Sequence, residues 1–372
     1  MAKKGKPLKR GNSILSPNAL AFLTRYINNP SPVGFESGGQ KLWLDYLRPH
    51  IDKFFFDPYG TAVGIVNPDA KFKVVIEAHA DEISWFVNYV NPEGLLYLKR
   101  NGGVDHQIAP GQRVLIHGKK GIVKGVFGWP AIHTRMTNPE SKEPQPRADN
   151  LFLDCGARSK KEVENLGIHI GAVVTYQVGF EEISYDYFVG RAFDNRIGGF
   201  MIAEVARLLK ENRKKLTFGL YIVNAVQEEV GLRGAEMIAR RLKPDLAIVT
   251  DVTHDTSTPM VNKIVEGEVA CGKGPSLAYG PAVHNKFLEL VQNVARKKRI
   301  PVQLRAVSRS TGTDTESFAY ANDGCPSVLI SIPLRYMHTT VEMLHKKDIE
   351  QTISLMYETL LSLTPNINLR YP

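Results

Sequence analysis

The sequence has little cysteine and no long hydrophobic run, and both absences restrict the kind of protein it encodes. Three cysteines occur, far apart, at Cys155, Cys271 and Cys325. An odd and scattered set does not make a disulfide framework, so we expect a protein of the cytoplasm. No stretch of ~18 apolar residues is available to span a membrane. The basic N-terminus lacks the apolar segment of a signal peptide, so we expect no membrane partner and no secretion.

The net charge of +9 is the compositional feature that points toward nucleic acid. Five of these charges fall in the first ten residues, which contain no acid, so the remainder carries 9 − 5 = +4. A second basic cluster, 296–299, lies at the end of a predicted helix, where cations interact favourably with the helix dipole. No zinc-finger spacing or helix-turn-helix pattern occurs. We therefore interpret residues 1–12 as a solvated tail and expect no nucleic-acid partner.

The pattern of the chain changes twice, which predicts two domains within 372 residues. Residues 13–89 and 181–372 alternate helical patterns with apolar strand patterns. Residues 90–180 contain short apolar runs separated by glycine and proline, which is typical of a small β-rich unit or barrel. We expect the outer segments to form one α/β domain with a mixed, mostly parallel central sheet flanked by helices. The β-rich unit is then an insertion into that domain.

Residues 216–235 are the stretch around which the α/β domain is organised. The nearly continuous apolar run at 218–226 predicts a buried strand of a parallel sheet. Glu228 and Glu229 follow it, at the strand end where open α/β sheets bind ligands. This position suits a metal ligand beside a group that moves a proton. The alternative is that both glutamates only interact with the dipole of the next helix, which is expected to start near Arg233.

Glu229 is one of five side chains of the metal-binding type that stand at or just beyond predicted element ends: His79, Asp194, Glu229, Asp251 and His338. Two imidazoles and three carboxylates, with no thiolate, suit zinc, cobalt or manganese. Two metal ions ~3.5–4 Å apart need a bridging carboxylate and terminal ligands on each side, which five residues can supply. Each residue alone also has an ordinary explanation, such as a helix N-cap for Asp194.

His79 carries the strongest single signal, because Asp81 follows it two residues later. Residues i and i+2 share one face of a strand. A carboxylate in that position accepts the second N–H of a metal-bound imidazole and fixes its tautomer. We therefore predict that Asp81 orients His79.

Eight short stretches, taken in order, carry a resemblance to a known family. They are AHADEI (78–83), LFLDCGARSKKEVENLGIHIGAVV (151–174), AFDNRIGG (192–199), QEEVGLRGA (227–235), TDVT (250–253), GKGPS (272–276), TGTDTE (311–316) and PLRYMHTTVE (333–342). In this order they resemble the tetrahedral M42 metallo-aminopeptidases, which include glutamyl, leucyl and deblocking aminopeptidases. The resemblance covers nearly all of the chain beyond the basic tail. It implies a zinc-exopeptidase-like fold. It also implies an enzyme that hydrolyses the first peptide bond of peptide substrates.

The resemblance also implies roles for the five ligands and for the assembly. Asp194 would bridge two divalent ions, zinc or cobalt, in each subunit. His79 and Asp251 would complete one site, and Glu229 and His338 the other. Dimers would assemble further, up to a hollow dodecamer.

The remaining implied roles concern the catalytic groups and the substrate. Glu228 would be the general base, and Asp81 would orient the imidazole of His79. The chain departs from the family pattern at four positions that touch no ligand: Ser84, Thr311, Thr315 and Thr339. The threonines lie near the expected substrate side chain, so the preferred N-terminal residue is not determined by the resemblance.

We expect a homo-oligomer built through residues 90–180, a unit that adds nothing to the metal centre itself. Its apolar runs are short for a free-standing core. Trp129 and Ile132 lie near those runs and are natural contact residues, since aromatics are enriched at interfaces. The alternative is that this unit is a lid over the active site.

Three other functions compete with an aminopeptidase. A related N-acyl amino-acid deacylase or carboxypeptidase has a similar ligand order but carries its extra domain later. Here the ligand spacing is 194 − 79 = 115 positions before Asp194 and 338 − 251 = 87 positions after Asp251, which places the insertion early. An endoglucanase needs two carboxylates and no metal, which leaves the histidines unused. A non-catalytic interaction module needs neither metal ligands nor a general base, so the presence of the complete set argues against this function.

Overall fold

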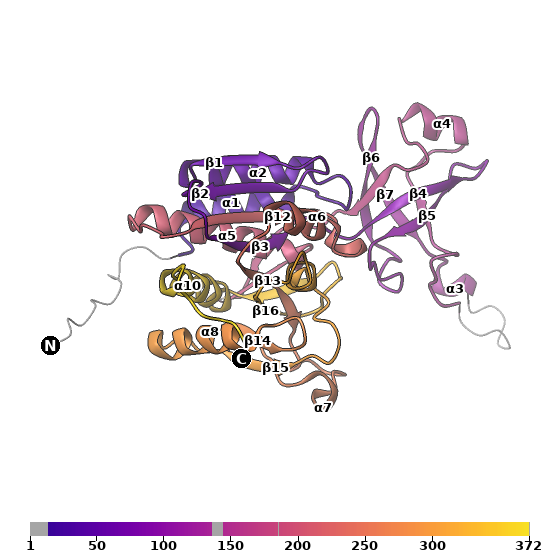
Figure 1. Ribbon diagram of the computed structural model, residues 1–372. Helices are drawn as coiled ribbons and strands as arrows, with labels where there is room; N and C mark the ends of the chain where they lie inside the picture. Colours follow the sequence, from indigo (N-terminus) through magenta and orange to yellow (C-terminus); the bar gives the residue numbers. More distant parts are fainter. Residues whose placement is uncertain (1–13, 136–143, 185, 372) are drawn as a thin grey trace.

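The computed structural model describes residues 14–135, 144–184 and 186–371 of the chain. The predicted tail 1–12 lies outside the described residues. Figure 1 shows an α/β body and, beside it, a smaller β-rich unit. None of the helices in the described ranges has the length and apolar character needed to cross a membrane.

An eight-stranded sheet forms the centre of the α/β body. Its order is β1 (Lys53–Phe56), β2 (Ala62–Val66), β12 (Gly219–Ala225), β3 (Lys73–His79), β13 (Leu246–His254), β16 (Ser327–Leu334), β14 (Ser276–Tyr279) and β15 (Gln303–Ala306). The middle strands β12, β3, β13 and β16 are parallel, while β2 and β14 run antiparallel to their inner neighbours. This confirms the predicted mixed sheet with a parallel centre.

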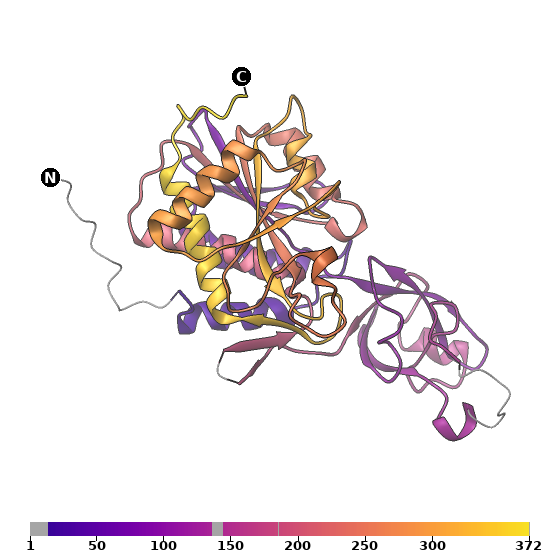
Figure 2. The same ribbon diagram turned by 90° about the horizontal axis from the view of Figure 1, so that it is seen from below.

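Helices cover both faces of the sheet (Figures 1 and 2). One layer contains α1 (Pro17–Asn28), α2 (Ser37–Leu47), α5 (Phe193–Glu211), α8 (Asn285–Lys298) and α10 (Lys346–Ser362). The other contains α6 (Arg233–Leu242) and α9 (Thr315–Ala319). The first helix begins where its sequence requires, because Ser16 accepts a hydrogen bond from the Ala19 N–H and Pro17 occupies the first helical position.

The strand predicted at 218–226 is present as β12, and all seven of its residues are buried. Burial on both faces explains why its sequence is a continuous apolar run rather than an alternating one. The next helix, α6, starts close to the end of this strand. A Cβ atom at Gly234 would lie 2.3 Å from the carbonyl oxygen of Val226, so the close approach requires glycine. This packing places the two glutamates between the strand and the helix.

The β-rich unit is a closed six-stranded barrel with a core of its own. Its strands are, in order around the barrel, β4 (Ser84–Val90), β5 (Leu96–Asn101), β8 (Phe152–Asp154), β7 (Gly121–Gly128), β6 (Arg113–Gly118) and β9 (Val173–Tyr176). Trp85 and Phe127 meet edge to face inside it, with ring centroids 5.6 Å apart. Two short helices, α3 (Ile132–Arg135) and α4 (Lys160–Asn165), lie in its connections. The predicted inserted β-rich unit is therefore confirmed, whereas division at residues 90 and 180 stays a prediction.

A small three-stranded sheet connects the barrel to the α/β body. It consists of β10 (Glu181–Ile183), β11 (Tyr187–Gly190) and β17 (Glu342–His345). Gly190 pairs with Glu342, so the chain entering α5 lies beside the segment that follows β16. Two parts of the sequence about 150 positions apart are thereby held next to each other, and each carries a predicted ligand.

Candidate metal centre

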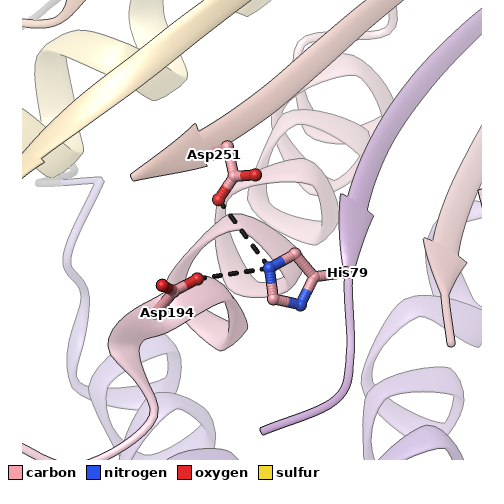
Figure 3. Close-up of side chains that lie close together, drawn as sticks. All are labelled: His79, Asp194 and Asp251. Carbon is pink, nitrogen blue, oxygen red and sulfur yellow. Dashed lines mark ion pairs between the residues drawn. The ribbon is translucent and has the colours of Figure 1, made fainter. Parts of the chain in front are cut away.

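The predicted ligands converge where the central parallel strands end. His79 is the last residue of β3, and Asp194 stands at the start of α5, where the backbone is not yet helical. Glu229 lies in the short 3₁₀ turn η2 (Glu228–Val230) that follows β12. His338 follows β16 in the connection to β17. Figure 3 shows His79, Asp194 and Asp251 turned toward one another from three different elements.

The position of Asp251 relative to its strand differs from the prediction. The sequence analysis places Asp251 at or just beyond the end of a predicted element, but β13 continues to His254. The reason is pairing rather than composition, because β16 continues the parallel ladder as far as His254 and Leu334. Asp251 therefore projects from within a strand, which gives its carboxylate a rigid backbone.

Two histidines face each other across one carboxylate. Nε2 of His79 lies 3.2 Å from Oδ1 of Asp194, and Nε2 of His338 lies 3.2 Å from Oδ2 of the same side chain. Asp251 Oδ1 is 3.8 Å from Nε2 of His79, and Glu229 Oε1 is 3.3 Å from Nε2 of His338. The five side chains thus fall into two groups that share Asp194.

The donor atoms in each group are close enough to hold one ion. His79, Asp194 and Asp251 offer ligand atoms within 4.8 Å of one another, and so do Asp194, Glu229 and His338. Nitrogen and oxygen donors of this kind suit a divalent transition metal. With Glu228, the cluster contains four carboxylates, whose four negative charges equal the positive charge of two divalent ions. The residues therefore fit a two-metal site.

Burial of the cluster shifts the pKa of its members. Burial raises the pKa of Asp251 to about 7 and that of Glu228 to about 10. Burial alone would lower the pKa of His338, but contacts with Asp194 and Glu229 outweigh it and raise the pKa to about 12. For Asp194 burial is again outweighed, and its ion pairs with both histidines hold its pKa well below the usual range. Protons or cations must therefore neutralise the concentrated negative charge.

Asp81 lies beyond the end of β3 rather than on the strand as predicted. Its Oδ1 is still only 3.5 Å from Nδ1 of His79, which leaves Nε2 of that ring for the cluster. The same carboxylate accepts the backbone N–H groups of Glu228 and Glu229, at 3.0 and 3.1 Å. Asp81 therefore fixes the turn that carries both glutamates as well as contacting the histidine.

Glu342 performs the same task on the other side of the centre, and the sequence analysis did not single it out. Its buried carboxylate accepts the backbone N–H of His338 at 2.9 Å and that of Asp194 at 3.2 Å. The available signal was its position four residues after His338 in the last matching stretch. Two buried carboxylates, Asp81 and Glu342, therefore hold the backbone beneath four of the clustered side chains.

The barrel contributes to the centre, which corrects the expectation that it adds nothing there. The carbonyl oxygen of Gly103, in the connection after β5, lies 3.2 Å from Nδ1 of His338. A carbonyl only accepts, so Nδ1 donates and Nε2 remains free to face Asp194. A Cβ atom at position 103 would lie 3.0 Å from the imidazole, which favours glycine at this contact. The insertion thus orients one histidine through its backbone.

Strained backbone surrounds the centre. Five non-glycine residues next to or within the ligand segments have positive φ, between 58° and 62°: Ala192, Gln227, Leu232, Tyr336 and His338. Such conformations are uncommon outside glycine, and they persist only where the surrounding structure imposes them. Their concentration around one cluster indicates a site whose side-chain directions are fixed by the fold.

The comparison with protein families agrees with this geometry. The model of the family described as M42 glutamyl aminopeptidase matches residues 60–355. The chain belongs to the M42 family. It is accordingly a peptidase, and M42 peptidases are metal-dependent. The resemblance inferred from the eight sequence stretches is confirmed.

Individual relatives match this M42 chain over most of its length. The lysyl aminopeptidase of Pyrococcus furiosus is 32% identical over 347 residues, which cover 92% of this chain and 97% of the relative. A TET aminopeptidase structure from a marine sediment Thaumarchaeota archaeon has 31% identity and a TM-score of 0.89, with 94% and 97% of the two chains covered. The Pyrococcus horikoshii TET1 peptidase, described as assembling into a tetrahedron or an octahedral shell, shares the fold at 24% identity, a TM-score of 0.82 and coverage of 93% and 100%.

A pocket opens from the metal centre of this M42 chain toward the edge of the sheet. Beyond the clustered side chains, its lining includes Thr253, Arg305, Thr311, Thr313 and Met337. Thr311 is one of the positions where the chain departs from the family pattern. Arg305 was not singled out from the sequence, because a basic residue in a short edge strand carries no signal of its own.

We expect the metal-free protein to lose stability as the pH rises from about 5 to about 9. Folding raises the pKa of Asp251 from 3.8 to about 7, that of Glu228 from 4.5 to about 10 and that of His338 from 6.5 to about 12. Between each pair of values the folded state holds more protons than the unfolded state. The free energy of unfolding therefore falls with rising pH in these windows. Melting temperatures measured in a chelator across this range test the expectation.

The matched control is the same pH series after zinc has been added back. Bound cations take over the neutralising role of the protons, so the loss of melting temperature between pH 5 and pH 9 should shrink or disappear. Chelated protein that is as stable at pH 9 as at pH 5 contradicts this account of the cluster.

Proposed function

We propose that this M42 chain is a dinuclear aminopeptidase that removes the N-terminal residue from peptides. The observation that supports two metal ions is the position of Asp194, which faces a histidine at 3.2 Å on each of its two carboxylate oxygens. His79 and Asp251 would hold one ion, and Glu229 and His338 the other. Zinc or cobalt matches these ligands, and divalent cations would neutralise the buried negative charge of the cluster.

Glu228 is the proposed proton carrier, and its surroundings support that role. When bound, the metal ions lower the pKa of a water molecule and polarise the scissile carbonyl. Glu228 accepts the proton of the attacking water and delivers it to the leaving amine. Its Oε2 lies 3.8 Å from Nε2 of His79, so the carboxylate is beside the proposed metal centre. The hydrogen bond from its backbone N–H to Asp81 fixes the turn from which the side chain projects.

The competing proposal within this chemistry is a deacylase or carboxypeptidase, and the substrate's free amine distinguishes the two. An aminopeptidase cleaves aminoacyl anilides only when the α-amine is free. A deacylase prefers the N-acetylated form, and a carboxypeptidase needs a free C-terminal carboxylate. We therefore propose to assay free and N-acetylated aminoacyl anilides, together with N-acetylated peptides, on protein stripped of metal and reloaded with zinc, cobalt or manganese. Cleavage confined to acetylated substrates would exclude the proposal.

The proposed assembly is a homo-oligomer built through the barrel, in line with the shells described for TET peptidases. The barrel surface supports this, because it exposes large apolar side chains at Tyr89, Ile122, Ile132 and Ile170. A contact between the barrels of two subunits would cover these side chains. In a closed shell the active sites would admit peptides and exclude folded proteins. Localisation in the cytoplasm remains a prediction.

We expect light scattering at micromolar concentration to give the mass of an oligomer, well above the 41.5 kDa of a single chain. Replacing Ile122 and Ile132 with glutamate should shift the protein toward smaller species, because a desolvated charge opposes contact. The matched control replaces Val341, which is equally exposed but lies on the α/β body, with glutamate. A fully active wild type at the monomer mass would overturn the proposed assembly.

A further inference from the structure

Arg305 reaches the pocket of the metal centre from the edge of the sheet. It lies in β15, whose register pairs it with Ala278 of β14. The residue before it, Leu304, points the opposite way and is about half exposed, as alternation along a strand requires. Arg305 therefore lines the same cavity as His79 and Asp251.

The charge of Arg305 has no partner within the protein. Among the described residues none forms an ion pair with it, and its buried Nε has no hydrogen-bond acceptor. Burial lowers its pKa, and only the more distant charges of Asp251 and Glu266 act on it. Asp251 belongs to the metal cluster, and Glu266 is an exposed residue of α7 (Lys263–Glu266) that does not line this cavity. A partly buried cation without a partner is costly unless a ligand supplies the opposite charge.

The other groups near Arg305 do not compete for it. The hydroxyl groups of Thr311, Thr313 and Thr315 form a chain of hydrogen bonds at 2.8 Å, which ends on the carboxylate of Glu316. The acidic residues that line the cavity are the four of the metal cluster, whose charge the ions neutralise. The outer part of the pocket is therefore left with a net positive charge, which disfavours a lysine or arginine side chain.

We propose, resting on the proposed aminopeptidase function, that Arg305 selects peptides whose N-terminal residue is aspartate or glutamate. The planar guanidinium binds the side-chain carboxylate of that residue in a two-pronged hydrogen bond while its carbonyl lies at the metal centre. The family does not decide this point, since the relatives of this chain include a lysyl aminopeptidase and a glutamyl aminopeptidase. The proposed preference for an acidic N-terminal residue rests on Arg305 of this chain.

The test compares specificity rather than activity alone. The metal-loaded wild type and Arg305→Met are assayed with glutamyl, aspartyl, leucyl and lysyl anilides, and kcat/KM is obtained for each. We expect the wild type to prefer the acidic substrates. In Arg305→Met the ratio of glutamyl to leucyl kcat/KM should fall by roughly 10–100-fold, as expected for a lost charged hydrogen bond. Arg309→Ala removes the same charge outside the pocket and should keep the wild-type ratio.

The outcomes separate this proposal from the one on which it rests. Anilides have no C-terminal carboxylate, so preference for glutamyl anilide identifies the side chain as the partner of Arg305. A wild type that cleaves leucyl or lysyl anilide best overturns the specificity but leaves the aminopeptidase standing. A wild type that cleaves no free aminoacyl anilide overturns both. The wild-type preference is informative even if Arg305→Met does not fold.

Discussion

Replacing Glu228 with glutamine should lower kcat by ~10²–10⁴-fold and leave the metal content unchanged. Glutamine keeps the size of the side chain and can still occupy the turn held by Asp81. It removes the group that accepts a proton, so the chemical step loses its base while the ligand set stays complete. Metal analysis of the purified variant, together with kcat and KM for an aminoacyl anilide, measures both parts of the expectation.

The matched control is Glu229→Gln, one residue away on the same turn. Glu229 lies 3.3 Å from Nε2 of His338, so its substitution should reduce metal content as well as activity. The geometry also contains a rival arrangement, because His79, Glu228 and Glu229 offer donor atoms within 4.8 Å of one another. If Glu228→Gln loses metal as Glu229→Gln does, Glu228 is a ligand and the assignment of the base is wrong.

Replacing Asp194 with alanine should abolish both metal sites and reduce activity to background. Each of its carboxylate oxygens faces a different histidine, so the substitution removes a ligand from each site at once. Calorimetric titration of the stripped variant with zinc should show no binding at the affinity of the wild type.

The comparison for this variant is Glu229→Ala, which should weaken one site and spare the other. A bridging residue and a terminal residue therefore give different titration curves, with two sites lost in one variant and one in the other. Circular dichroism of both variants checks that the fold is intact. Two unchanged sites in Asp194→Ala would disprove the bridge.

The sequence predicted the parts of this molecule that depend on local pattern. The apolar run of β12 is continuous because the strand is buried on both faces, and this run alone located the centre of the sheet. The short apolar runs between glycines and prolines predicted the barrel. The seven site residues named from the sequence all lie in one cluster, because each stands near an element end at the same edge of the sheet. Their individual roles remain predictions.

The parts that were missed depend on contacts between distant segments. No local pattern indicates that the carbonyl of Gly103 orients His338, because every residue has a carbonyl and the contact spans 235 positions. Glu342 supports Asp194 through pairing of β11 with β17, two strands of four residues each. A binding role for Arg305 could be inferred only from the cavity that it lines. The place of Asp251 within β13, rather than at its end, follows from the ladder of β13 with β16, which continues as far as His254.

The central claim is that two metal ions, bridged by Asp194, make the site active, and a metal titration tests it most directly. Protein stripped of metal is titrated with zinc or cobalt while bound metal and hydrolysis of a free aminoacyl anilide are both measured. We predict that binding saturates at two ions per subunit and that full activity appears only as the second ion binds. Full activity with one ion per subunit, or in the continued presence of a chelator that has removed all metal, would contradict the claim.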